Sequence, residues 1–182
     1  HGLLAQRGLT YTGKTRIKHF LSVLYYDVGL DTLKNSIIRH YKDCNIATHY
    51  GCHVLRPSKI TRFDDPVAPS IFDKLVEITG AKSVEWTRKL ECCGAPVLGF
   101  NDDLSMSLTK KKISSGKKAG ADYLCSACPY CHLQFDTVQK MMVSQNGNDP
   151  LASVLYQQLL GDRKSTRLKD SHFRTSSMQC SA

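Results

Sequence analysis

The feature that most constrains the fold of this chain is a regular alternation of short apolar strands with amphipathic helices. Four segments read as strands: residues 45–49, 83–86, 122–125 and 153–156. Helical spacing of apolar residues indicates helices between them, at 69–79, 102–119 and 129–143. Such alternation is typical of a parallel sheet with crossover helices. We therefore predict a small three-layer α/β domain with a parallel sheet, spanning residues 42–161.

The residues before this domain show a different pattern. An apolar stripe at helical spacing predicts an amphipathic helix over residues 14–27, and its members are Ile17, Phe20, Leu21, Leu24 and Val28. A second helix is expected at 31–41. Both precede the first cysteine, and the chain opens on His1 without an initiator methionine. We expect residues 1–41 to be a helical connector at the end of a missing N-terminal domain, packed against that domain.

The chain changes character again after Gly161. Residues 162–182 are polar and basic without any period, and Asp162 to Leu168 is close to the translation of a common sequencing adapter. We expect a non-native or disordered tail, and a native basic tail is the alternative. The tail holds five Lys or Arg and two Asp, or +3 of the formal net charge of +9, which leaves +6 on the body.

Composition limits the classes of function. A hydrophobic fraction of 41% and a charged fraction of 23% are those of a globular protein. The basic body is compatible with nucleic acid, anionic substrates or acidic partners, but no nucleic-acid-binding signature is present, and we expect no such partner. Without a secretory pattern or an apolar run of about 20 residues, we expect a cytoplasmic protein with no direct membrane span. The lysine runs at 110–112 and 117–118 are interpreted as the solvated face of a helix.

The chain has eight cysteines, which in this setting favour metal or redox chemistry over a disulfide framework. Three are set aside: Cys44 lies in a strand pattern and reads as a buried apolar residue, Cys125 ends a strand and reads as core, and Cys180 lies in the tail. The remaining five follow the first three strands: Cys52, Cys92, Cys93, Cys128 and Cys131. Because ligands gather beyond the carboxyl ends of parallel strands, we predict that three loops bring these thiols to one edge.

The neighbours of these cysteines support a binding site. Gly51 and Gly94 remove side-chain bulk where the backbone passes close to a cofactor or takes a positive φ. Pro129 suits the first turn of a helix, which places Cys128 at the helix N-terminus, where a thiolate is stabilised. A CxxC pair alone is a weak signal. Its combination with Cys-Cys-Gly and an upstream Gly-Cys-His is highly specific.

The spacing of these motifs resembles a known family. The pattern is a single cysteine at 52, Cys-Cys-Gly at 92–94 and Cys-Pro-x-Cys at 128–131, with long gaps at 53–91 and 94–127. This pattern is similar to that of the CCG cysteine-rich domain found in the B subunit of heterodisulfide reductase. The resemblance covers about residues 9–161. The second gap is a residue or two shorter than usual. A whole B subunit carries two such domains, and this chain resembles the C-terminal one.

The resemblance implies a function and a ligand set. It implies that a noncubane [4Fe-4S] cluster is bound by Cys52, Cys92, Cys93, Cys128 and Cys131. Members of this family take part in the two-electron reductive cleavage of a disulfide, either the coenzyme M-coenzyme B heterodisulfide or a related one. The implied partners are the other reductase subunits, namely a flavin iron–sulfur protein and a ferredoxin-like protein. As an isolated fragment the chain is expected to be inactive.

Three alternatives stay open. Related CCG domains pass electrons in lactate, glycolate and glycerol-phosphate oxidising complexes. Four of the five cysteines could instead hold zinc in a non-catalytic docking module. The Cys128–Cys131 dithiol also matches glutaredoxins, although thioredoxin-like folds place it after the first strand. His49 and His53 flank Cys52 and are either hydrogen-bond donors to the site or simply packed near it.

Overall fold

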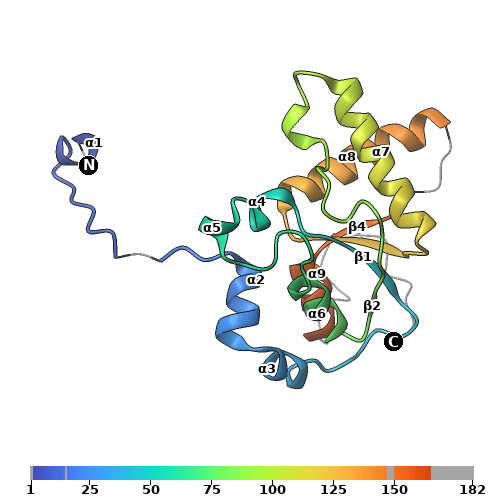
Figure 1. Cartoon of the computed structure of the whole chain (residues 1–182), viewed down its shortest axis with the longest axis horizontal. Helices are drawn as coiled ribbons and strands as arrows, with labels where there is room; N and C mark the ends of the chain where they lie inside the picture. The colour runs from blue at the N-terminus through green and yellow to red at the C-terminus, as the bar shows by residue number, and fades with distance from the viewer. Residues whose placement is uncertain (1, 15, 147–149, 165–182) are drawn as a thin grey trace.

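A four-stranded parallel sheet forms the centre of the computed structural model, which describes residues 2–14, 16–146 and 150–164 (Figure 1). The strand order is β2-β1-β3-β4. The strands are β1 (Asn45–His49), β2 (Lys82–Ser83), β3 (Tyr123–Ser126) and β4 (Ser153–Leu155). All three pairings are parallel, with Ile46 opposite Tyr123 and Leu124 opposite Ser153. The predicted parallel α/β architecture is therefore confirmed.

Helices cover both faces of the sheet and produce three layers (Figure 1). The pair α6 (Ile71–Glu77) and α9 (Tyr156–Lys164) covers one face, and the pair α7 (Asp102–Lys118) and α8 (Pro129–Asn146) covers the other. Successive strand residues point to opposite faces, so each face has its own core. Ile46 and Cys125 belong to the core under α6 and α9, whereas Ala47 and Leu124 belong to the core under α7 and α8.

The remaining elements are short. Before the sheet lie α1 (Gly2–Ala5), α2 (Phe20–Ser22), the π-helical turn η1 (Val23–Val28) and α3 (Leu30–Asn35). After β1 come α4 (Cys52–Leu55) and α5 (Ser58–Thr61), and the 3-10 turn η2 (Ala95–Val97) precedes α7. Of these, the sequence predicted only the region of α2, η1 and α3. Among the described residues, no helix is both long and apolar enough to span a membrane.

The N-terminal helices are shorter than predicted. The first begins at Phe20 rather than at residue 14, with the His19 ring accepting a hydrogen bond from the Leu21 N–H, and Ile17 is 94% exposed. The second ends at Asn35 rather than near residue 41. Leu21, Leu24 and Leu33 are buried in the same core as Ile46. These leucines therefore complete the core of this domain, and the expected packing of the two helices against an upstream domain stays a prediction.

The second strand and the tail also differ from the prediction. Only Lys82 and Ser83 form β2, because the chain leaves the sheet after Val84 and the Trp86 indole N–H donates to the Thr48 carbonyl at 3.1 Å. At the other end, residues 162–164 continue α9 instead of starting a disordered tail. The expected tail from residue 165 onward, including Cys180, lies outside the described residues.

The strand order creates one place where loops diverge. From β1 the chain continues to β2 on one side, through α6, and from β3 it continues to β4 on the other side, through α8. The carboxyl ends of β1 and β3 are adjacent, with His49 opposite Ser126. Such a switch point is where open parallel sheets bind ligands, since the two departing loops leave a crevice between them.

Candidate metal centre

Three loops bring the five predicted cysteines together at this switch point. Cys52 begins α4 directly after β1, Cys92 and Cys93 lie between β2 and α7, and Cys128 and Cys131 lie at the start of α8 after β3. The sulfur atoms interact across the loops. The pKa of the Cys52 thiol is raised first by burial and then by the charges of Cys92, Cys93 and Cys128. The sequence predicted this convergence from the order and spacing of the strands and cysteines.

The most compact part of the site joins two cysteines and a histidine. A ring nitrogen of His49 and the sulfur atoms of Cys93 and Cys131 all lie within 4.8 Å of one another, and all three side chains are buried. His49 closes β1, one position before the Tyr50-Gly51 turn. From the sequence, His49 could be either a hydrogen-bond donor to the site or a packing residue. The one clue to its burial beside the cysteines was its position at the end of a predicted strand. His53, in contrast, is exposed.

Gly51 allows the loop after β1 to touch the CxxC segment. Its φ is +78°, and a Cβ at this position would lie 3.3 Å from the Cys128 Cβ and 3.9 Å from the Cys131 sulfur. The positive φ expected from the sequence is present. A side chain here would press on Cys128 and Cys131 and widen the contact between this loop and the CxxC segment.

The Cys-Cys-Gly loop is fixed by hydroxyl groups of α7. The Thr109 hydroxyl donates to the Cys93 carbonyl at 2.7 Å, and the Ser105 hydroxyl donates to the Gly94 carbonyl at 2.9 Å. The side-chain amide of Gln134, from α8, donates to both hydroxyls. Because all of these groups are buried, the network holds the loop in one position between α7 and α8.

Lys112 holds the segment just before the cysteine pair. Its side chain is buried, and its ammonium donates to the Arg88 carbonyl and, at 3.0 Å, to the Glu91 carbonyl. The ammonium also lies 4.7 Å from the centroid of the Trp86 ring, a cation–π contact. Burial lowers the Lys112 pKa to about 8, and nearby Glu91 and the cysteines oppose that shift. The interpretation of 110–112 as a solvated face is wrong for Lys112, although Lys111 is exposed.

Cys128 lies at the N-terminus of α8, as predicted, and Pro129 occupies the first helical position. The pKa of Cys128 is lowered to about 6, chiefly by the hydrogen bond from the Cys131 thiol and also by the backbone N–H groups of Cys131 and Tyr130. Cys131 also lowers the pKa of Cys93, and its own pKa is raised because its proton is shared with both neighbours. A bound cation would take the place of this shared proton.

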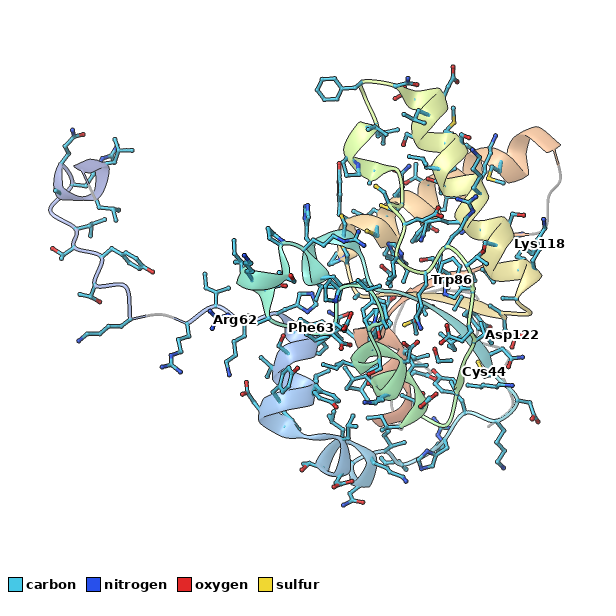
Figure 2. All side chains as sticks on the ribbon, in the orientation of Figure 1. Cys44, Arg62, Phe63, Trp86, Lys118 and Asp122 are labelled. Carbon is cyan, nitrogen blue, oxygen red and sulfur yellow. The ribbon has the colours of Figure 1, made fainter. Side chains whose placement is uncertain are left out.

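The other described cysteines lie away from this group. Cys125 is completely buried among apolar residues on the opposite face of the sheet, which confirms its interpretation as core. Cys44 is buried too, and Figure 2 shows it beside Asp122, at the end of the sheet where β1 and β3 begin. The five remaining thiols thus form a separate donor set. Soft thiolates in this number suit iron–sulfur clusters and zinc, so the residues fit such a group.

The comparison with known families agrees with this geometry. A model of the CCG cysteine-rich domain matches residues 46–136. The chain belongs to the CCG cysteine-rich domain family. The matched segment of this CCG domain begins in β1 and ends in α8, and it contains all five cysteines of the site.

Known relatives of this CCG domain are reductase subunits. It is 41% identical over 161 residues to the B subunit of the ferredoxin/F(420)H(2)-dependent CoB-CoM heterodisulfide reductase of Methanosarcina acetivorans, covering 87% of this chain and 53% of that protein. It is 42% identical to the B subunit of the ferredoxin:CoB-CoM heterodisulfide reductase of Methanosarcina mazei, with the same coverage. A protein of Archaeoglobus profundus that is itself described as like the heterodisulfide reductase B subunit is 35% identical, over 77% of this chain and 48% of that protein. The chain therefore spans about half the length of these relatives.

Metal binding to the CCG domain should depend steeply on pH. Because the pKa values of Cys52 and Cys131 are raised, a metal that binds both sulfur atoms must displace a proton from each of them. Each released proton changes the apparent affinity about tenfold per pH unit, so we expect a gain of about 100-fold from pH 6.5 to 7.5. Titration of the metal-free chain with Zn²⁺ against a competing chelator measures this slope. Equal affinity at the two pH values would contradict the shared-proton description.

Proposed function

We propose that this chain is part of the iron–sulfur subunit of a heterodisulfide reductase-type oxidoreductase, and that its five clustered cysteines hold a noncubane [4Fe-4S] cluster. The observation that supports the proposal is the convergence of Cys52, Cys92, Cys93, Cys128 and Cys131 from three loops at the switch point of the sheet. Four thiolates complete a cubane cluster. A fifth thiol in the same group favours a cluster of another shape.

The thiols differ in solvent exposure, so one side of the site is buried and the other faces solvent. Cys93 and Cys131 are buried, whereas Cys52, Cys92 and Cys128 are partly exposed. A cleft of about 900 Å³ lies beside Cys92, and Arg56, Trp86 and Lys89 contribute to its walls. The buried side holds the thiolates away from water, and the cleft gives a small molecule access. The wall also contains Glu85 and Glu91, and Lys89 is paired with Asp73 and Glu85, so these side chains give the cleft no net positive charge.

An iron–sulfur cluster would supply electrons here, two of which convert a disulfide into two thiolates. The task of the chain itself is to hold the five thiolates, and the hydroxyl network of Ser105 and Thr109 fixes two of them through the backbone of the Cys-Cys-Gly loop. Lys112 adds a positive charge close to Cys92, Cys93 and Cys131, which offsets part of the negative charge of the thiolates.

The names of the relatives suggest the setting of this activity. Since they are subunits of CoB-CoM heterodisulfide reductases, we propose the same heterodisulfide, or a related disulfide, as the substrate class. A flavin iron–sulfur protein and a ferredoxin-like protein, as further subunits of the reductase, are the proposed partners, in the cytoplasm. We also propose that residues 42–161 form the cluster-binding domain and that residues 1–41 connect it to a preceding domain.

The test is metal analysis of the chain after anaerobic purification or reconstitution with iron and sulfide. We expect a brown protein with about four irons and a similar amount of acid-labile sulfide per chain. About one zinc and no sulfide would support a docking module instead. A metal-free chain with a reactive Cys128–Cys131 dithiol would support the glutaredoxin alternative.

A further inference from the structure

His49 occupies an unusual position beneath the cysteine group. Its side chain is completely buried, and its ring packs edge-on against Phe135 of α8, with centroids 5.1 Å apart and planes at 81°. On its other side lie Cys93 and Cys131, within the 4.8 Å group described above. Neither ring nitrogen has a hydrogen-bond partner among the described residues. Both polar atoms of a core side chain are thus unpaired.

Packing alone does not explain a histidine at this position. Burying unpaired polar atoms costs free energy, and a phenylalanine or leucine would fill the same space without that cost. A neutral imidazole has one N–H donor and one lone pair, and neither finds a partner among the described residues. The N–H therefore lacks an acceptor, and the closest reactive atoms are sulfurs.

We propose that His49 donates its ring N–H to the Cys93 thiolate when the cluster is bound, and that this hydrogen bond raises the reduction potential of the cluster. The Cys93 sulfur lies within 4.8 Å of a ring nitrogen, and hydrogen bonds from Ser105 and Thr109 fix the loop that carries it, so the two atoms are held near each other. A donor to a ligating sulfur withdraws negative charge, which helps the reduced, more negative state most. This inference rests on the proposed cluster and adds a positioning residue to it.

One other acceptor competes for the same N–H. The backbone carbonyl of Lys89 also lies near the ring, although it does not complete a hydrogen bond. If the ring N–H donated to that carbonyl instead, His49 would have a structural role: it would link the 85–91 segment to β1 by a hydrogen bond. The two arrangements differ in a measurable way, because only the bond to sulfur changes the electronic state of the cluster.

The test compares reduction potentials of the reconstituted chain and three variants. His49→Phe removes both nitrogens but keeps a ring, His49→Gln retains an N–H donor, and Phe135→Leu disturbs the packing of the ring but leaves its nitrogens in place. We expect His49→Phe to bind the same amount of iron and sulfide with a more negative midpoint potential. His49→Gln should recover part of the shift, and Phe135→Leu should leave the potential close to that of the unmodified chain.

A second measurement uses the unmodified chain and is independent of how well the variants fold. With ¹⁵N-labelled histidine, pulsed EPR of the reduced cluster should detect a weak nitrogen coupling, as expected through a hydrogen bond to sulfur. A strong coupling would show direct ligation of iron, and no coupling, or an unchanged potential in His49→Phe, would show a packing role. Either result overturns the inference. If the unmodified chain binds no iron, the proposed function itself fails, and that outcome is visible before any variant is made.

Discussion

Replacing Cys93 or Cys131 by alanine should reduce the iron content of the reconstituted chain at least about tenfold, because even residues that only support a metal ligand change affinity by that factor. Both thiols are buried at the centre of the site, and each interacts with a second cysteine and with His49. Iron and sulfide assays on anaerobically reconstituted protein measure the loss, and the charge-transfer absorbance of the cluster follows it.

Cys125→Ala is the matched control for these two variants. It removes the same sulfur from an equally buried position, but on the opposite face of the sheet. It should cost about 1–2 kcal/mol of stability through the small cavity and leave the iron content unchanged. If Cys125→Ala lost as much iron as Cys93→Ala, general destabilisation and not ligand loss would explain all three results.

Measuring the iron content of alanine variants of each of the five cysteines distinguishes a noncubane cluster from a cubane. A cubane takes four cysteines, so one of the five would be dispensable. Cys52, Cys92 and Cys128 are partly exposed, and they are the positions at which a spare thiol would be found. Loss of iron in all five variants supports the noncubane cluster, and retention in one of them contradicts it.

The sequence predicted the bounds of strands and helices best where the local sequence pattern favours the same structure that the packed fold adopts. The bounds of β1 were predicted without error and those of α7 within one residue, because residues that favour turns and caps stand at their ends: Gly51 soon after β1, and Asn101 and Gly120 around α7. β2 was predicted too long. Its edge position leaves only two residues paired, and the apolar residues that follow, up to Trp86, are buried under α7 instead of in the sheet.

Two residues show what a linear pattern cannot reveal about the site. Lys112 belongs to a run of three lysines that reads as a solvated surface, yet the helix turns this one inward onto two carbonyl groups. His49 is one histidine among seven, and its importance arises only when β1 and the loops from Cys93 and Cys131 are brought together. The cysteines were predictable because their spacing is rare, whereas these partners depend on the folded chain.

Gly94→Ala should be among the most damaging substitutions outside the thiols, since it combines two separate costs. Gly94 has φ +97° and ψ −16°, a left-handed conformation that disfavours any Cβ. An added Cβ would also lie 2.5 Å from the Ser105 carbonyl oxygen, a backbone atom in the first turn of α7 that the helix holds in place. We expect a loss of about 3–5 kcal/mol in the free energy of unfolding of the metal-free chain.

Gly99→Ala separates the two costs, because Gly99 lies in the same connection with φ +87° but has open space where a Cβ would be. It should lose only about 1 kcal/mol, which is the cost of the backbone conformation, and keep its iron. Gly94→Ala, in contrast, must push the Cys-Cys-Gly loop away from Ser105 and Thr109, which moves Cys93 out of the thiol group and lowers iron loading as well. Chemical denaturation and iron assays on both variants test this difference. Equal losses would mean that the close contact with α7 does not position the loop, and that backbone conformation alone explains the glycine in Cys-Cys-Gly.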